Sequence, residues 1–128
     1  MNISRPWRIW LTFNPYETVI RPALLTDWLE LTGKGQQKCV NKMIEMCKDL
    51  HINGMDCRYL KWFGDNIGEL KSRTSDGGAR VYLFRVGKEG FALTRAECKN
   101  EDESDPELVD WTFEVAALYE QDFDVLDQ

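Results

Sequence analysis

The chemistry that this sequence offers is carried by cationic and aromatic side chains between residues 61 and 99. Cleavage of RNA at a 2′-hydroxyl needs a base for that proton, cations for the charged phosphorane and an acid for the leaving oxygen. Lysine, arginine and tyrosine can share these tasks without a metal or a histidine when neighbouring charges depress the pKa of a lysine. The candidate residues are Lys61, Lys71, Arg73, Arg80, Tyr82 and Lys99.

The spacing of these residues predicts where they meet. Side chains alternate between the two faces of a strand, so Glu69, Lys71 and Arg73 share one face. By the same rule Arg80 and Tyr82 share a face of the next strand. Because the connection between the two strands is short, we expect the three cations to converge at one end of a sheet.

Lys61, from the preceding loop, and Lys99, just after the third strand, complete this predicted basic patch. Such a patch suits RNA, because cations hold phosphates and aromatic rings stack on unpaired bases. The plainer interpretation is that these are solvated charges on a half-exposed sheet, and the residue pattern alone favours it. The nearby glycines fit turns and form no phosphate-binding loop.

Three predicted strands position these residues, over 67–74, 79–86 and 91–98. The glycine-rich connections at 75–78 and 87–90 are short turns, so the strands form an antiparallel meander. A final helix is predicted from a start signal at Ser104 or Asp105 to about Tyr119, with a short acidic tail to residue 128.

The first half of the chain supplies the remaining elements. Residues 5–13 alternate apolar and polar side chains, which predicts a strand. Apolar residues at helical spacing predict helices over 22–31 and 36–50, joined as a helical hairpin. Residues 51–66 are expected to be irregular. The fold class is therefore α+β, with the N-terminal strand and the meander forming a four-stranded sheet.

Length and composition predict one domain over residues 1–128. Of the 128 residues, 43% are hydrophobic and 30% are charged, which favours a packed core over disorder. The four cysteines form no CxxC pair and the chain has one histidine, so we expect reduced thiols, no metal and no cofactor. Met1–Trp10 lack the apolar centre of a signal peptide, and no apolar run is long enough for a membrane span, so we expect a cytoplasmic location.

Charge is distributed unevenly along the chain. Residues 1–96 carry 15 Lys and Arg and 10 Asp and Glu, whereas residues 97–128 carry 12 Asp and Glu and only Lys99 as a base. Most of the chain is therefore mildly basic and the segment 97–128 strongly acidic. Another hypothesis is that the acidic end folds over the basic sheet and neutralises it in cis.

The run YLKWFGDNIGELKSRTSDGGARVYLFRV, residues 59–86, resembles the central signature of the RelE/ParE/HigB toxin superfamily. The matching pieces are Leu60-Lys61, Glu69-Leu70-Lys71, Gly77-Gly78 and Arg80-Val81-Tyr82, followed by Lys99, Pro106 and the last helix. The order of strand, helical hairpin, meander and helix is also similar over about residues 5–120. The resemblance implies a RelE-like fold and places the chain nearest to HigB-like, phage-related toxins.

The resemblance implies a toxin that acts on RNA as a metal-independent endoribonuclease or translation inhibitor, with a cognate antitoxin and the RNA or ribosome as partners. It assigns catalysis to Lys71, Arg73 and Arg80, of which Arg80 would contact the scissile phosphate, and RNA binding to Lys61, Tyr82 and Lys99. The acidic residues that follow Lys99 depart from the basic family pattern and would repel phosphates. The alternative is a catalytically inactive RelE-like protein-binding module that uses its acidic C-terminal surface.

Overall fold

A computed structural model describes residues 6–15, 18, 21–64 and 66–126, and only the backbone of 120–126. In chain order the elements are β1 (Arg8–Leu11), α1 (Ala23–Gly33), α2 (Gln37–Asn53), a 3-10 turn η1 (Gly54–Asp56), β2 (Leu60–Gly64), β3 (Ile67–Thr74), β4 (Gly77–Val86), β5 (Gly90–Lys99) and α3 (Pro106–Leu126). The α+β class is confirmed.

Within the described residues, one sheet of five strands, in the order β1-β5-β4-β3-β2, forms the centre of the fold. The predicted meander is present, because β3 pairs antiparallel with β4 and β4 antiparallel with β5. β1 joins the edge parallel to β5. The predicted four-stranded sheet is wrong by one strand: β2, which falls in the segment expected to be irregular, pairs antiparallel with β3.

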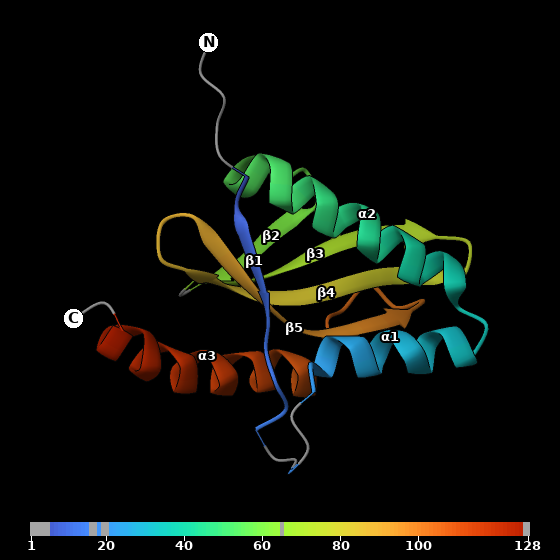
Figure 1. Ribbon diagram of the computed structural model, residues 1–128. Helices are drawn as coiled ribbons and strands as arrows, with labels where there is room; N and C mark the ends of the chain where they lie inside the picture. Colours follow the sequence, from blue (N-terminus) through green and yellow to red (C-terminus); the bar gives the residue numbers. More distant parts are fainter. Residues whose placement is uncertain (1–5, 16–17, 19–20, 65, 127–128) are drawn as a thin grey trace.

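Helices cover both faces of the sheet (Figure 1). α1 and α2 share the larger core cluster with the inward residues of β3, β4 and β5. α3 packs on the opposite face, where Val115 and Ala116 meet Ile67, Phe84 and Ala92. Burying one stripe of each helix against the sheet removes apolar surface from water, at roughly 25 cal/mol per Å².

The helical hairpin also forms as predicted. Pro22 immediately precedes α1, and Gly35, with φ 81°, lies in the short connection to α2. α2 continues three residues beyond its predicted end at Leu50, to Asn53, and Gly54, with φ 56°, ends it. A side chain at Gly54 would collide with the indole of Trp7, so this glycine also makes room for the segment that leads into β1.

An ion pair joins α1 to the sheet. Arg95 on β5 donates from Nε and Nη2 to the two carboxylate oxygens of Asp27, at 2.8 and 3.1 Å. The backbone N–H of Ala96 donates to the same carboxylate at 2.9 Å. The guanidinium of Arg95 also lies 4.8 Å from the ring centre of Trp111 on α3, so one side chain connects both helical layers.

α3 differs from its prediction in length. It begins at Pro106, with Asp105 Oδ1 accepting from the backbone N–H of Glu107 at 2.9 Å, which selects Asp105 over Ser104 as the cap. It extends past Tyr119 to Leu126, so the expected tail is helical up to that residue. Residues 127–128 and the predicted strand position Arg5 lie outside the described residues. No helix in the described part of the chain is long and apolar enough to cross a membrane.

Two cysteines are paired, which corrects the expectation of four reduced thiols. Cys39 in the first turn of α2 and Cys98 near the end of β5 form a disulfide, with their Cα atoms 6.2 Å apart. The start of α2 also binds the β3–β4 turn, because the backbone N–H of Lys38 donates to Asp76 at 3.0 Å. The pair could not be recognised from the sequence, because the two cysteines are 59 residues apart and belong to no motif.

Reduction of this disulfide is expected to lower the free energy of unfolding by about 4 kcal/mol, because it releases a loop of 59 residues in the unfolded chain. Urea denaturation with and without dithiothreitol measures the difference. The matched control is the double variant Cys39→Ala/Cys98→Ala, in which the reductant should change nothing. Equal stability of the oxidised and reduced wild type would contradict the prediction.

Candidate functional site

The cations predicted to converge do line one small cavity. It has a volume of about 50 Å³ and lies at the end of β3, β4 and β5, beneath the segment that follows β5. The register explains the convergence, because Lys71 pairs with Arg80, and Arg80 in turn with Glu97 on β5. The cavity is lined by Lys71, Arg73, Thr74, Gly77, Gly78, Arg80, Lys99, Asn100, Glu101 and Asp102.

Two predicted RNA-binding residues lie outside this cavity. Lys61 is exposed on β2 and pairs with Glu69 in the register of the sheet. Tyr82 is fully buried, and its hydroxyl accepts a hydrogen bond from the backbone N–H of Asp105 at 3.2 Å. Burial raises the pKa of Tyr82, and the carboxylates of Glu97 and Glu69 raise it further. The phenol is therefore held protonated as part of the core.

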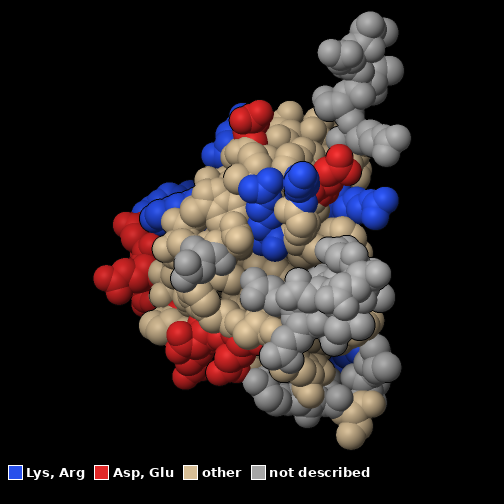
Figure 2. Space-filling model, turned by 90° about the vertical axis from the view of Figure 1, so that its left-hand side faces the viewer, with Lys and Arg blue, Asp and Glu red and all other residues tan. Residues whose placement is uncertain are grey.

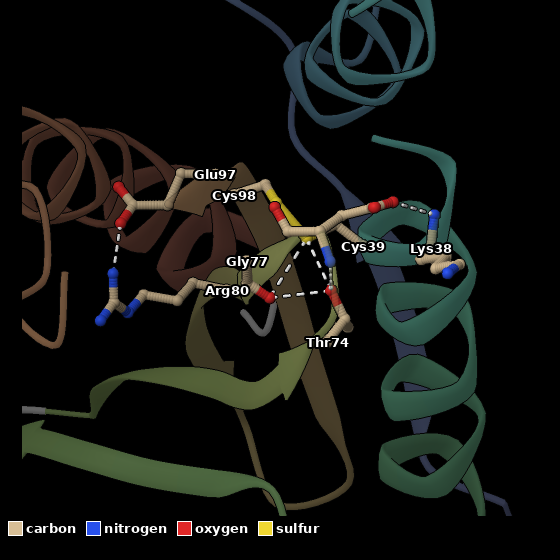
Figure 3. Close-up of a disulfide and its surroundings, with 8 residues drawn as sticks. Lys38, Cys39, Thr74, Gly77, Arg80, Glu97 and Cys98 are labelled. Carbon is tan, nitrogen blue, oxygen red and sulfur yellow. Dashed lines mark hydrogen bonds and ion pairs between the residues drawn. A yellow bond between two sulfur atoms is a disulfide. The ribbon is translucent and has the colours of Figure 1, made fainter. Parts of the chain in front are cut away.

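Arg80 lies at the centre of a buried ionic network. Its Nη1 donates to Glu97 Oε1 at 2.8 Å, and its Nη2 to the carbonyl oxygen of Glu101, also at 2.8 Å. Its Nε lies 3.9 Å from Glu69 Oε2, and both of these side chains are 1% exposed. Figure 3 shows Arg80 reaching toward Glu97, beside the disulfide. In this conformation the guanidinium binds the protein itself rather than facing solvent.

The other three cations of the cavity are engaged by the acidic segment. Lys71 Nζ donates to the carbonyl oxygen of Asp102 at 3.1 Å. Arg73 forms an ion pair with the carboxylate of Asp102. Lys99 Nζ lies 3.5 Å from Glu97 Oε1 and 4.0 Å from Glu101 Oε2. The segment 100–102 therefore contacts all four cations, although Arg73 stays largely exposed.

The C-terminal side of this segment is attached to the same sheet. The hydroxyl of Ser104 donates to Glu69 Oε2 at 2.9 Å. The next backbone N–H, that of Asp105, donates to Tyr82. Two buried residues on neighbouring strands thus fix the chain just before α3. Residues 100–103 are consequently held at both ends. β5 precedes them, and the hydrogen bonds of Ser104 and Asp105 follow them.

The carboxylates Glu69 and Glu97 are the site residues that sequence reasoning missed. The strand pattern puts Glu69 on the same face as Lys71 and Arg73 but assigns it no role. Its partner becomes evident only when the register sets Arg80 between β3 and β5. A glutamate on each of the strands beside Arg80, β3 and β5, could have indicated this network, because a buried guanidinium needs carboxylates nearby.

The two free cysteines provide no activated nucleophile. Burial raises the pKa of the Cys47 thiol to about 12. Burial and then a hydrogen bond from the Cys57 thiol to Asp49 raise the pKa of Cys57 to about 11. Both groups are therefore thiols at neutral pH, whereas nucleophilic cysteines have a depressed pKa. In the described part of the chain no three His, Cys, Asp or Glu side chains are grouped to hold a metal ion.

Comparison with known proteins does not assign this chain to a family. A scan against models of protein families finds no match, and a search of curated proteins finds none either.

Arg80→Met is expected to lower the free energy of unfolding by about 3 to 5 kcal/mol, because it leaves buried carboxylates without their counter-charge. Denaturant unfolding measures the loss. Adding Glu97→Gln to Arg80→Met should recover part of it, so the two effects should not add. A small loss, or simple additivity, would show that the guanidinium is not committed to this network.

Proposed function

We propose that this chain is a RelE-like protein-binding module that recognises a basic partner, rather than a ribonuclease. The observation that supports this most is the state of Arg80, the residue that the resemblance assigns to the scissile phosphate. Its side chain is 1% exposed and is bound to Glu97 and to the carbonyl oxygen of Glu101. A phosphate contact through Nη2 would require the protein to give up the bond to Glu101.

The charged residues between positions 103 and 114 are all acidic. Glu103, Glu107, Asp110 and Glu114 are exposed on the segment before α3 and on α3 itself. Three of them, at 107, 110 and 114, recur at helical spacing and so lie on one side of α3. Figure 2 shows Asp and Glu gathered mainly at the lower left of one face, with Lys and Arg mainly above them. Such a surface attracts a basic partner by long-range electrostatics.

An aromatic side chain stands beside these carboxylates. Phe113 on α3 is 39% exposed, three residues after Asp110 and next to Glu114. Interfaces commonly combine an aromatic anchor with a polar rim, and the anchor carries a large share of the affinity. We therefore expect the partner to be a basic protein segment that carries an apolar side chain to cover Phe113.

Binding of a synthetic basic amphipathic helix, built of lysine and leucine, tests this surface by titration calorimetry. Glu107→Lys/Asp110→Lys should weaken binding about tenfold or more, because like charges then oppose the peptide. The control Asp56→Lys/Glu89→Lys makes the same change of charge at exposed positions away from α3. Equal weakening by both pairs, or by neither, would exclude α3 as the recognition surface.

An RNA-directed toxin with a cognate antitoxin is the second candidate, favoured by one observation. Lys71, Arg73, Arg80 and Lys99 line a single cavity, which is the clustering that phosphate binding needs. Expression in bacteria should then arrest growth, and Lys71→Ala/Lys99→Ala should relieve the arrest. Lys34→Ala/Lys48→Ala, at exposed positions on the helical hairpin, is the control. Normal growth with the wild type would remove this candidate.

A further inference from the structure

The acidic segment places three oxygen atoms from two successive residues on three cations. The carbonyl oxygen of Glu101 lies 2.8 Å from Arg80 Nη2, and that of Asp102 lies 3.1 Å from Lys71 Nζ. The carboxylate of Asp102 binds Arg73. We infer that residues 101 and 102 occupy an oxyanion site, which binds a phosphate-bearing ligand when this segment is displaced.

The charges of the cluster match such a ligand once the segment is removed. Four cations line the cavity, and with the segment in place they face the carboxylates of Glu69, Glu97, Glu101 and Asp102. Displacing the segment takes away Glu101 and Asp102 and leaves two positive charges in excess. Two of the three bonds from the segment come from neutral carbonyl oxygens, whereas phosphate oxygens would form stronger, charge-assisted bonds to the same groups.

The buried polar atoms beneath the segment are not fully satisfied. Arg80 Nε and Glu97 Oε2 are both enclosed and lack a hydrogen-bond partner. Buried groups of this kind are rare and usually mark a water, an ion or a functional site. The cavity of about 50 Å³ has room for a few waters at most, so a phosphate ester must displace the segment to enter.

Displacing the segment breaks two bonds to backbone carbonyl oxygens and one exposed ion pair. The side chains of Arg73 and Asp102 are 73% and 75% exposed, and an ion pair of that exposure stabilises little. The two ends, in contrast, are fixed: Cys98 by the disulfide, and Ser104 and Asp105 by their bonds to Glu69 and Tyr82. Only the residues between these anchors need to move.

This inference goes beyond the proposed partner surface, because it concerns Glu101 and Asp102 and not the acidic residues of α3. The ligand is defined by its phosphate group, which can belong to a free polyphosphate or to the backbone of an RNA. The two sources are distinguished by two probes, inorganic pyrophosphate and a fluorescently labelled ten-nucleotide oligouridylate. Binding of one probe and not the other identifies the source of the phosphate. Neither measurement depends on the basic peptide binding to α3.

The test is the variant Glu101→Gln/Asp102→Asn, which removes the charge of the segment and keeps its length. Pyrophosphate affinity is measured by calorimetry, and oligouridylate affinity by fluorescence anisotropy at low salt. Affinity for at least one probe should rise about tenfold over the wild type, and Lys71→Ala in the same background should abolish the gain. Glu107→Gln/Asp110→Asn carries the same change of charge on α3 and should leave affinity unchanged.

Two results would overturn the inference. An equal gain in the α3 control would mean that only the overall charge matters. No gain with either probe, in a variant that melts like the wild type, would mean that the segment does not occupy an oxyanion site. The milder variant Asp102→Asn provides the same comparison if the double variant loses stability.

Discussion

The guanidinium of Arg80 imposes the strongest constraint on this structure. Removing a charged group from water costs several kcal/mol, and the cost is offset only by carboxylates and hydrogen bonds in good geometry. Glu97 on β5, Glu69 on β3 and the carbonyl oxygen of Glu101 supply these contacts. Because each comes from a different segment, the register of three strands and the course of the chain after β5 must be compatible with one side chain. The acidic segment is thus part of the fold.

This constraint changes how the basic residues are interpreted. The sequence brings together the cations that RNA chemistry would use, and the cavity contains four of them. Proximity alone does not make them available, however, because each has an acidic residue or a carbonyl oxygen of the following segment as its neighbour, and Arg80 is also buried. A family resemblance carried by residue types reports which side chains occur at which strand positions. It cannot report what lies on top of them.

The sequence predicted the elements that depend on local pattern and missed those that depend on distant packing. Alternation and glycine turns were sufficient for the meander, and helical spacing for the hairpin. β2 was missed because it has only five residues, Leu60–Gly64, and the adjacent Trp62 and Phe63 break the alternation of apolar and polar side chains. The disulfide and the burial of Arg80 were missed for another reason: periodicity assigns a residue to a face, and tertiary contacts decide whether that face is covered. Tyr82 illustrates this, since its strand position was predicted correctly while its ring is fully buried.

The uneven distribution of charge has a structural explanation in two parts. The acidic residues up to Asp102 contact cations of the sheet: Glu97 is buried against Arg80, whereas the side chains of Glu101 and Asp102 are exposed beside Lys99 and Arg73. Four acidic residues between positions 103 and 114 are exposed: Glu103, Glu107, Asp110 and Glu114. The division falls at Ser104 and Asp105, which are attached to buried residues. These attachments lie between the acidic residues that contact the cavity and those exposed on α3, so the two groups of carboxylates occupy different surfaces of the fold.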